Sequence, residues 1–91
     1  MVHMQDITTI ALENDDKIPV IDLHESDNID SALEQLEKEL FSYYQKGEKY
    51  IKVVHGIGTG VLEEKLVEQI KLNPLIKDFA IGKSGYLFLE I

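Results

Sequence analysis

The chain has 91 residues and a formal net charge of −8, and it contains no cysteine. Its length predicts a single domain with a modest hydrophobic core, and the lack of cysteine excludes disulfides, thiolate metal sites and cysteine nucleophiles. The 17 acidic residues outnumber the nine basic ones, which are all lysines. This excess of negative charge argues against tight unaided binding of nucleic acid, because such binding depends on cationic side chains that neutralise phosphates. No apolar run reaches the ~20 residues that span a bilayer, and we expect a cytoplasmic protein without a membrane partner.

Residues 1–18 show no sustained hydrophobic periodicity. We interpret them as an N-terminal arm, with residues 1–4 left by cloning. We expect residues 19–91 to form the domain itself. The arm has apolar side chains that can pack on this domain, namely Ile7, Ile10 and Leu12.

The first regular pattern is PVIDLH, at residues 19–24, and it predicts a strand. Side chains alternate along a strand. Ile21 and Leu23 therefore lie on one face of the predicted sheet, and Asp22 and His24 lie on the other.

Apolar residues then recur at spacings of three and four, which predicts a helix. They form a single stripe, made of Ile29, Leu33, Leu36, Leu40 and Tyr44. Ser26, Asp27 or Asn28 is available to cap the start of this helix, and Gly47 suits its end.

The rest of the chain predicts one more helix and three more strands. The strands are expected over residues 50–55, 76–82 and 86–91, and the helix runs from about Gly60 to Leu72. The sequence GKSG between the last two strands fits a short hairpin loop. The order of elements is therefore β-α-β-α-β-β, which is an α/β fold.

This order brings distant residues to one edge of the sheet. Crossovers through a helix normally join parallel strands by right-handed connections. His24 and His55 are therefore expected together at the carboxyl ends of the first two strands, where open α/β sheets bind ligands. A parallel third strand adds Lys83, in the hairpin loop, to the same edge.

Three glycines occupy the junction between the second strand and the second helix, in HGIGTG at residues 55–60. Glycine permits positive φ and close approach of the backbone to a ligand, and a helix N-terminus suits a phosphate. The pattern is not a P-loop, because no lysine follows the last glycine, and Val61 stands where a dinucleotide fingerprint has its third glycine. The glycines either hold a phosphate or only make a tight turn.

The two histidines allow several kinds of site. Asp22 shares a strand face with His24, so its carboxylate can orient that imidazole or bind a metal ion. Two imidazoles can supply a general acid and a general base near neutral pH, and their neutral forms can instead ligate a divalent ion. The spacing of His24 and His55 leaves these alternatives open, together with purely structural roles.

Aromatic residues are expected on the sheet face opposite the helices, where alternation places Tyr50, Tyr86 and Phe88. Exposed aromatic rings on a sheet can stack nucleic-acid bases. The interpretation that we prefer is that the N-terminal arm or a partner covers them.

Two of these segments together resemble the Smr (small MutS-related) domain family. That family carries a Leu-Asp-x-His motif on its first strand and a His-Gly-x-Gly-Thr-Gly motif at its second strand-to-helix turn. This chain has Ile-Asp-Leu-His at residues 21–24 and His-Gly-Ile-Gly-Thr-Gly at residues 55–60. The resemblance extends over residues 19–91.

The resemblance implies a two-layer α/β sandwich, in which two helices cover one face of a four-stranded mixed sheet and the last strand is antiparallel. Such a fold is similar to the C-terminal domain of translation initiation factor three. The resemblance also implies an endonuclease that nicks DNA or cleaves RNA, with a role in DNA repair or recombination. The catalytic residues that it implies are Asp22, His24 and His55. The implied nucleic-acid-binding residues are Gly56, Gly58, Thr59 and Gly60, with Lys83 added from the hairpin loop.

The chain departs from the family pattern at Glu25, where the family usually has glycine, and this negative charge opposes an approaching phosphate. We therefore hold two hypotheses. In the first, the domain hydrolyses phosphodiesters or binds DNA or RNA weakly, with Mg²⁺ or Mn²⁺ as a cofactor if Asp22 is a metal ligand. In the second, a non-catalytic module binds a protein partner through its aromatic sheet face. A fused domain is an alternative source of the missing affinity for nucleic acid.

Overall fold

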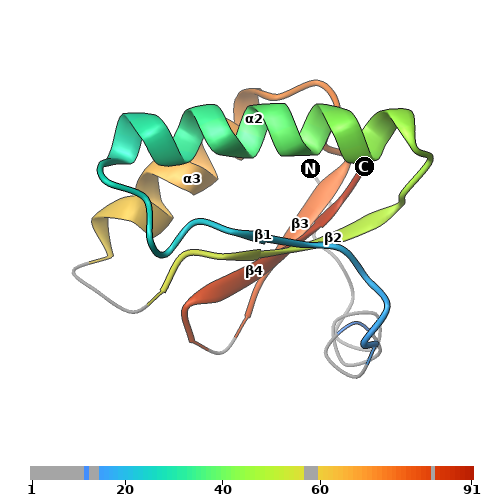
Figure 1. The fold of residues 1–91 in the computed structure, drawn as a ribbon, viewed down its shortest axis with the longest axis horizontal. Helices are drawn as coiled ribbons and strands as arrows, with labels where there is room; N and C mark the ends of the chain where they lie inside the picture. Colours follow the sequence, from blue (N-terminus) through green and yellow to red (C-terminus); the bar gives the residue numbers. More distant parts are fainter. Residues whose placement is uncertain (1–11, 13–14, 57–59, 83) are drawn as a thin grey trace.

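Two helices lie on the same face of a four-stranded mixed sheet in the computed structural model of the chain (Figure 1). The structure describes residue 12 and residues 15–56, 60–82 and 84–91. The elements follow one another as β1 (Val20–Asp22), α2 (Ile29–Gln45), β2 (Tyr50–Val54), α3 (Val61–Leu72), β3 (Asp78–Ile81) and β4 (Tyr86–Glu90). The predicted β-α-β-α-β-β sandwich is therefore confirmed.

The strands lie in the order β1-β2-β4-β3. β1 is parallel to β2, whereas β4 is antiparallel to both β2 and β3. The carboxyl ends of β1 and β2 and the hairpin that joins β3 to β4 consequently meet at one edge of the sheet, on the left of Figure 1. The sheet topology thus brings the two motifs and the hairpin together.

The start of α2 is fixed by a side-chain cap, because Asn28 Oδ1 accepts a hydrogen bond of 2.8 Å from the backbone N–H of Ser31. The predicted buried stripe of this helix is wrong at Tyr44, which is half exposed. Tyr43 packs against the core instead. The reason is helical phase: Tyr43 follows Leu36 by seven residues, which is close to two full turns at ~3.6 residues per turn.

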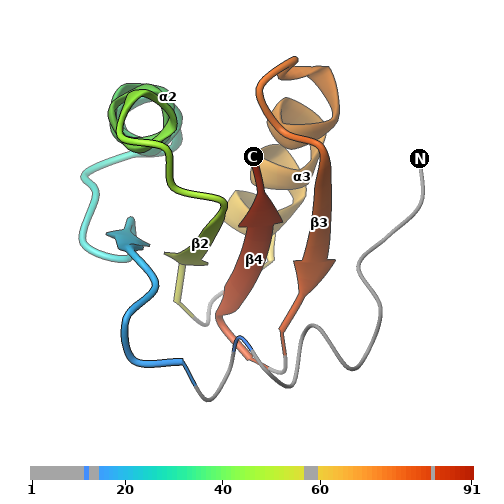
Figure 2. The same ribbon diagram turned by 90° about the vertical axis from the view of Figure 1, so that its right-hand side faces the viewer.

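The hydrophobic core lies between the helices and the sheet, as Figure 2 shows from the end of the helices. It is formed by alternating strand residues and by one stripe from each helix, and its fully buried members include Ile21, Leu23, Leu36, Leu40, Ile51, Val53, Leu66, Ile70, Leu87 and Leu89. The predicted alternation of β1 and β2 is therefore confirmed. Among the helices that the structure describes, none is long and apolar enough to cross a membrane.

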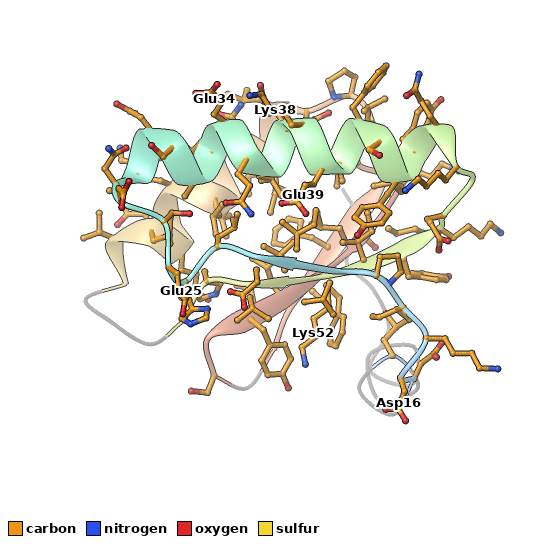
Figure 3. All side chains as sticks on the ribbon, viewed as in Figure 1. Asp16, Glu25, Glu34, Lys38, Glu39 and Lys52 are labelled. Carbon is orange, nitrogen blue, oxygen red and sulfur yellow. The ribbon has the colours of Figure 1, made fainter. Side chains whose placement is uncertain are left out.

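The sheet face away from the helices is not an open aromatic surface. Phe88 is fully buried, and its ring contacts that of Tyr86 edge to face, with centroids 5.5 Å apart. Lys52 Nζ lies 4.5 Å from the centre of the Tyr86 ring, and Figure 3 shows Lys52 pointing away from the helices.

Residues that precede β1 lie on this second face. Figure 2 shows the described residues before β1, drawn in blue, on the side of the sheet opposite the helices. Leu12 is buried, and a shallow hollow is lined jointly by Asp15, Lys17, Ile18 and Tyr50. These observations favour the alternative in which the N-terminal arm covers the aromatic residues.

We predict that Phe88→Ala lowers the free energy of unfolding by about 3–5 kcal/mol, as is usual when a buried phenylalanine is truncated. Val20→Ala is the control, because Val20 pairs with Lys52, Lys52 pairs with Phe88, and directly paired residues share a sheet face. Val20 is 48% exposed, and its truncation should cost about 0.5 kcal/mol or less. Urea denaturation measures both, and equal costs would mean that Phe88 is exposed in solution.

Candidate functional site

Asp22 and His24 form the first part of the site, at the carboxyl end of β1. They flank Leu23, which is buried in the core and whose backbone N–H donates a 2.7 Å hydrogen bond to the carbonyl of Val54 in β2. This arrangement keeps the Asp22 and His24 side chains outside the core. His24 is 46% exposed, so solvent and a ligand can reach its ring.

The Asp22 carboxylate holds both the backbone and the ring of His24. Its Oδ1 atom accepts a 3.1 Å hydrogen bond from the His24 backbone N–H and also contacts ring atom Nδ1. The side-chain hydrogen bond raises the pKa of His24 above its usual 6.5. The same bond lowers the pKa of Asp22 below its usual 3.8. The carboxylate therefore favours the charged form of the imidazole.

The other ring nitrogen of His24 also faces a carboxylate. Glu25 Oε1 lies 3.5 Å from His24 Nε2, and Figure 3 shows Glu25 in the turn between β1 and α2. Nε2 is the atom that is available to an incoming phosphate, since Asp22 occupies Nδ1. The Glu25 side chain therefore competes with an anion for this nitrogen.

Gly56 brings the backbone of the second motif against the first. Its φ of +80° lies in the left-handed region, and a Cβ added there would be 3.1 Å from the Cβ of His24. A larger residue would be strained in its backbone and would press on the histidine. Gly56 is thus required for the two motifs to touch, which is a packing role as well as the ligand-binding role that the sequence suggested.

Gly85, in the β3–β4 hairpin, completes this contact. Its carbonyl accepts hydrogen bonds from the backbone N–H groups of both His55 and Gly56, at 2.8 and 2.9 Å. A Cβ added at Gly85 would be 3.1 Å from the carbonyl carbon of Gly56, and its φ is +76°. Sequence reasoning missed Gly85 and chose Lys83 from the same loop. The available signal was a glycine directly before a strand, which often marks a close approach of two backbones.

His55 lies in a different environment from His24. Its side chain is only 6% exposed, and Nδ1 lies 3.0 Å from the carbonyl oxygen of Gly56. A carbonyl only accepts, so Nδ1 carries the hydrogen and the neutral ring has its lone pair on Nε2. Nε2 is buried and has no hydrogen-bond partner among the described residues; Glu63 Oε1 is 3.9 Å away.

The first turn of α3 begins beside these residues. Gly60 is the N-cap, with φ of +86°, and no described side chain caps the helix. Glu63 and Glu64 lie in this first turn, where acidic residues are favourable to the helix dipole but repel an added anion. Three of the predicted binding residues lie outside the described residues, namely Gly58, Thr59 and Lys83.

The described residues do not assemble a metal site around Asp22. Within them, no group of three or more histidine, cysteine, aspartate or glutamate side chains is placed to hold a metal ion. Asp22 Oδ1 is engaged by His24. The geometry of Asp22 fits an orienting partner of His24.

The match to known proteins covers the elements that carry this site. Residues 21–86 match the family model described as "Smr domain". The chain belongs to the Smr domain family. The crystal structure of the Smr domain of Thermus thermophilus MutS2 has the same fold, with a TM-score of 0.75 and 20% sequence identity over 80% of this chain and 96% of that one.

Curated relatives of this Smr domain are named Endonuclease MutS2. The protein from Acetivibrio thermocellus is 34% identical over 58 residues, which are 64% of this chain and 7% of the relative. The protein from Aquifex aeolicus is 32% identical over 81 residues, which are 87% of this chain and 10% of the relative. The Smr domain described here therefore spans a tenth or less of the length of these two proteins.

The two glycines Gly56 and Gly60 give a test of contact between the motifs. Both have positive φ, but an added Cβ contacts His24 only at Gly56 and meets nothing within 4 Å at Gly60. Gly60→Ala should therefore cost about 1–2 kcal/mol, from backbone strain alone. Gly56→Ala should cost more and should also move the NMR signals of the His24 ring. Equal costs, with the His24 signals unmoved, would show that the motifs are not in contact.

Removal of the Asp22 charge should lower the pKa of His24 towards 6.5. The raised pKa of His24 stabilises the folded protein below pH 6.5. This contribution to stability is lost as the pH rises through the raised pKa. The lowered pKa of Asp22 stabilises the folded protein above pH 3.8. This contribution to stability is lost as the pH falls through the lowered pKa. The loss of stability in Asp22→Asn should therefore be largest between pH 3.8 and 6.5.

Urea denaturation of the wild type and Asp22→Asn at pH 5.5 and pH 8.5 measures this difference, and an NMR titration of the ring protons measures the His24 pKa. Glu25→Gln is the control, because its carboxylate lies at the longer distance of 3.5 Å from Nε2. An Asp22→Asn variant that is equally destabilised at both pH values would contradict a charged Asp22–His24 pair.

Proposed function

We propose that this Smr domain acts on nucleic acid by hydrolysing phosphodiester bonds at the edge formed by Asp22, His24 and Gly56. The observation that carries the proposal is the Asp22–His24 pair, because it lies directly against the glycine of the second motif and its imidazole has a raised pKa. The name endonuclease, given to MutS2 relatives, supports the same reaction class. We further propose residues 19–91 as the functional unit, residues 1–18 as its arm, and a cytoplasmic role in DNA repair or recombination.

His24 is assigned the general acid. Its raised pKa keeps a larger share of the ring protonated near neutral pH, and its partial exposure leaves Nε2 accessible. Water attacks the phosphorus, the P–O bond to the leaving group breaks, and Nε2–H donates its proton to the departing oxygen. Asp22 orients the ring through Nδ1 and stabilises the imidazolium, the form that is present before the proton is donated.

His55 is assigned the general base. Because Nδ1 carries the hydrogen, the neutral ring presents a lone pair at Nε2, and this atom has no hydrogen-bond partner among the described residues. A base of this kind takes the proton from the attacking water. Nε2 is buried beside Glu63, so the proposal requires the Glu63 side chain to move when substrate binds.

The charge of the domain sets the expected affinity. Glu25 faces Nε2 of His24, and Glu63 and Glu64 lie in the first turn of α3. These carboxylates oppose a phosphate, so the isolated domain is expected to bind DNA or RNA weakly. A fused domain or a protein partner is the proposed source of additional affinity. Mg²⁺ or Mn²⁺ would require Asp22 as a ligand, and its Oδ1 atom is engaged by His24.

The test is a nicking assay on supercoiled plasmid, with a labelled RNA strand as a second substrate. Each is incubated with EDTA, with Mg²⁺ and with Mn²⁺. We expect slow cleavage that is lost in His24→Ala and in His55→Ala, and that falls as the pH rises through the raised pKa of His24. Unchanged cleavage in both variants would indicate a contaminating nuclease and would contradict the proposal.

Glu25→Gln distinguishes weak binding from absent binding. Removal of this charge should tighten oligonucleotide binding about 2- to 5-fold, which corresponds to the ~0.3–1 kcal/mol typical of exposed charge interactions. NMR titration with a short single strand at low salt measures it, and the shifts should centre on His24 and Gly56. Shifts centred on Tyr50 and Tyr86, with cleavage absent, would favour a non-catalytic binding module instead.

A further inference from the structure

Gln35 of α2 binds the backbone of the strand that carries the first motif. β1 is one of the two edge strands of the described sheet and pairs on one side with β2. The backbone groups of Pro19 and Leu23 face β2, because they form hydrogen bonds to Lys52 and Val54. Neighbouring residues of a strand direct these groups to opposite sides, so the carbonyl of Asp22 faces outward.

The Gln35 side chain takes the place of a neighbouring strand at this carbonyl. Its Nε2 atom donates a 3.1 Å hydrogen bond to the backbone oxygen of Asp22. The same amide nitrogen donates a 2.7 Å bond to Glu39 Oε2, one turn later in α2. Figure 3 shows Glu39 on the side of α2 that faces β1, whereas Glu34 and Lys38 point away from the sheet. Glu39 therefore orients the amide of Gln35 towards the strand.

Gln35 also binds the far end of the turn that contains His24. Ser26 Oγ donates a 3.3 Å hydrogen bond to Gln35 Oε1, and the backbone N–H of Ser26 donates a 3.1 Å bond to the carbonyl of Leu23. One side chain thus connects both ends of the turn from Asp22 to Ser26. His24 and Glu25 lie within this turn, and among the described residues the charged groups beside the His24 ring are Asp22 and Glu25.

We propose that Gln35 is a positioning residue for the site: it holds Asp22 and Ser26 at a fixed separation and thereby sets the contact between the Asp22 carboxylate and the His24 ring. Gln35 does not touch the substrate in this scheme. The inference rests on the proposed function for its catalytic meaning, but the contact that it sets can be measured without a substrate.

The variant Gln35→Met tests the proposal in the full chain, because methionine has a similar length and favours the helix but forms none of the three hydrogen bonds of the Gln35 side chain. The matched control is Gln69→Met, which removes the 2.7 Å hydrogen bond from Gln69 Nε2 in α3 to Glu37 Oε1 in α2. An NMR titration of the histidine ring protons gives the pKa of His24 in each variant. Gln35→Met should move this pKa towards its usual value of 6.5, and Gln69→Met should leave it as in the wild type.

Two further measurements complete the test. Ser26→Ala removes only the contact at the far end of the turn, and it should shift the His24 pKa in the same direction by a smaller amount. If Gln35→Met does not fold, the pKa of His24 in Ser26→Ala tests the positioning role of Gln35 instead. Where the wild type cleaves nucleic acid, Gln35→Met should reduce the rate by roughly 10-fold or more, since misplaced catalytic groups can cost about 100-fold.

An unchanged His24 pKa in folded Gln35→Met would overturn the proposal, as would an equal change in Gln69→Met. If Gln35→Met does not fold, an unchanged pKa in Ser26→Ala would overturn it. A failure of the proposed function gives a different result from a failure of the positioning role. In that case the wild type does not cleave nucleic acid, but Gln35→Met still shifts the pKa of His24.

Discussion

The arrangement of the site depends on the carbonyl of Gly85, which accepts two backbone hydrogen bonds. It receives the backbone N–H groups of both His55 and Gly56, and so it joins the β3–β4 hairpin to the end of β2. Gly56 is then placed against His24 at the end of β1. Three segments that are far apart in the sequence are thereby fixed at one edge of the sheet. Both glycines have positive φ and close neighbours, so neither position accepts a side chain without strain or displacement.

The electrostatics of this edge are unusual for a site that handles phosphate. Carboxylates face both ring nitrogens of His24, and a further carboxylate lies beside His55. A protonated histidine between two acids is stable but has little net positive charge to offer to an anion. The two motifs are in contact at this edge, and the surrounding carboxylates oppose the approach of an anion. This contrast explains why a source of affinity outside the domain belongs to the proposed function.

Local periodicity and the order of elements predict the fold, whereas individual contacts between distant segments leave no short pattern in the sequence. The burial of Ile21 and Leu23 follows from strand alternation, and the Asn28 cap follows from its side-chain chemistry. Tyr44 was assigned to the buried stripe because spacings of three and four do not fix helical phase after several turns. Gly85 and Gln35 were missed, since their partners lie at the ends of other elements and no short pattern records such contacts. Phe88 has the alternation of an outward residue but is fully buried, which strand alternation alone does not predict.

The short length of β1 has a consequence for the internal dynamics of the domain. β2 and β4 pair over five residues each, whereas β1 contributes three residues and pairs on one side. Local opening of a protein begins where few hydrogen bonds and few buried contacts must be broken. We therefore expect the strand that carries Asp22 to detach at a lower free energy than β2 or β4. The two halves of the site are therefore expected to differ in local stability, with the Asp22–His24 half opening before the half that holds His55 and Gly56.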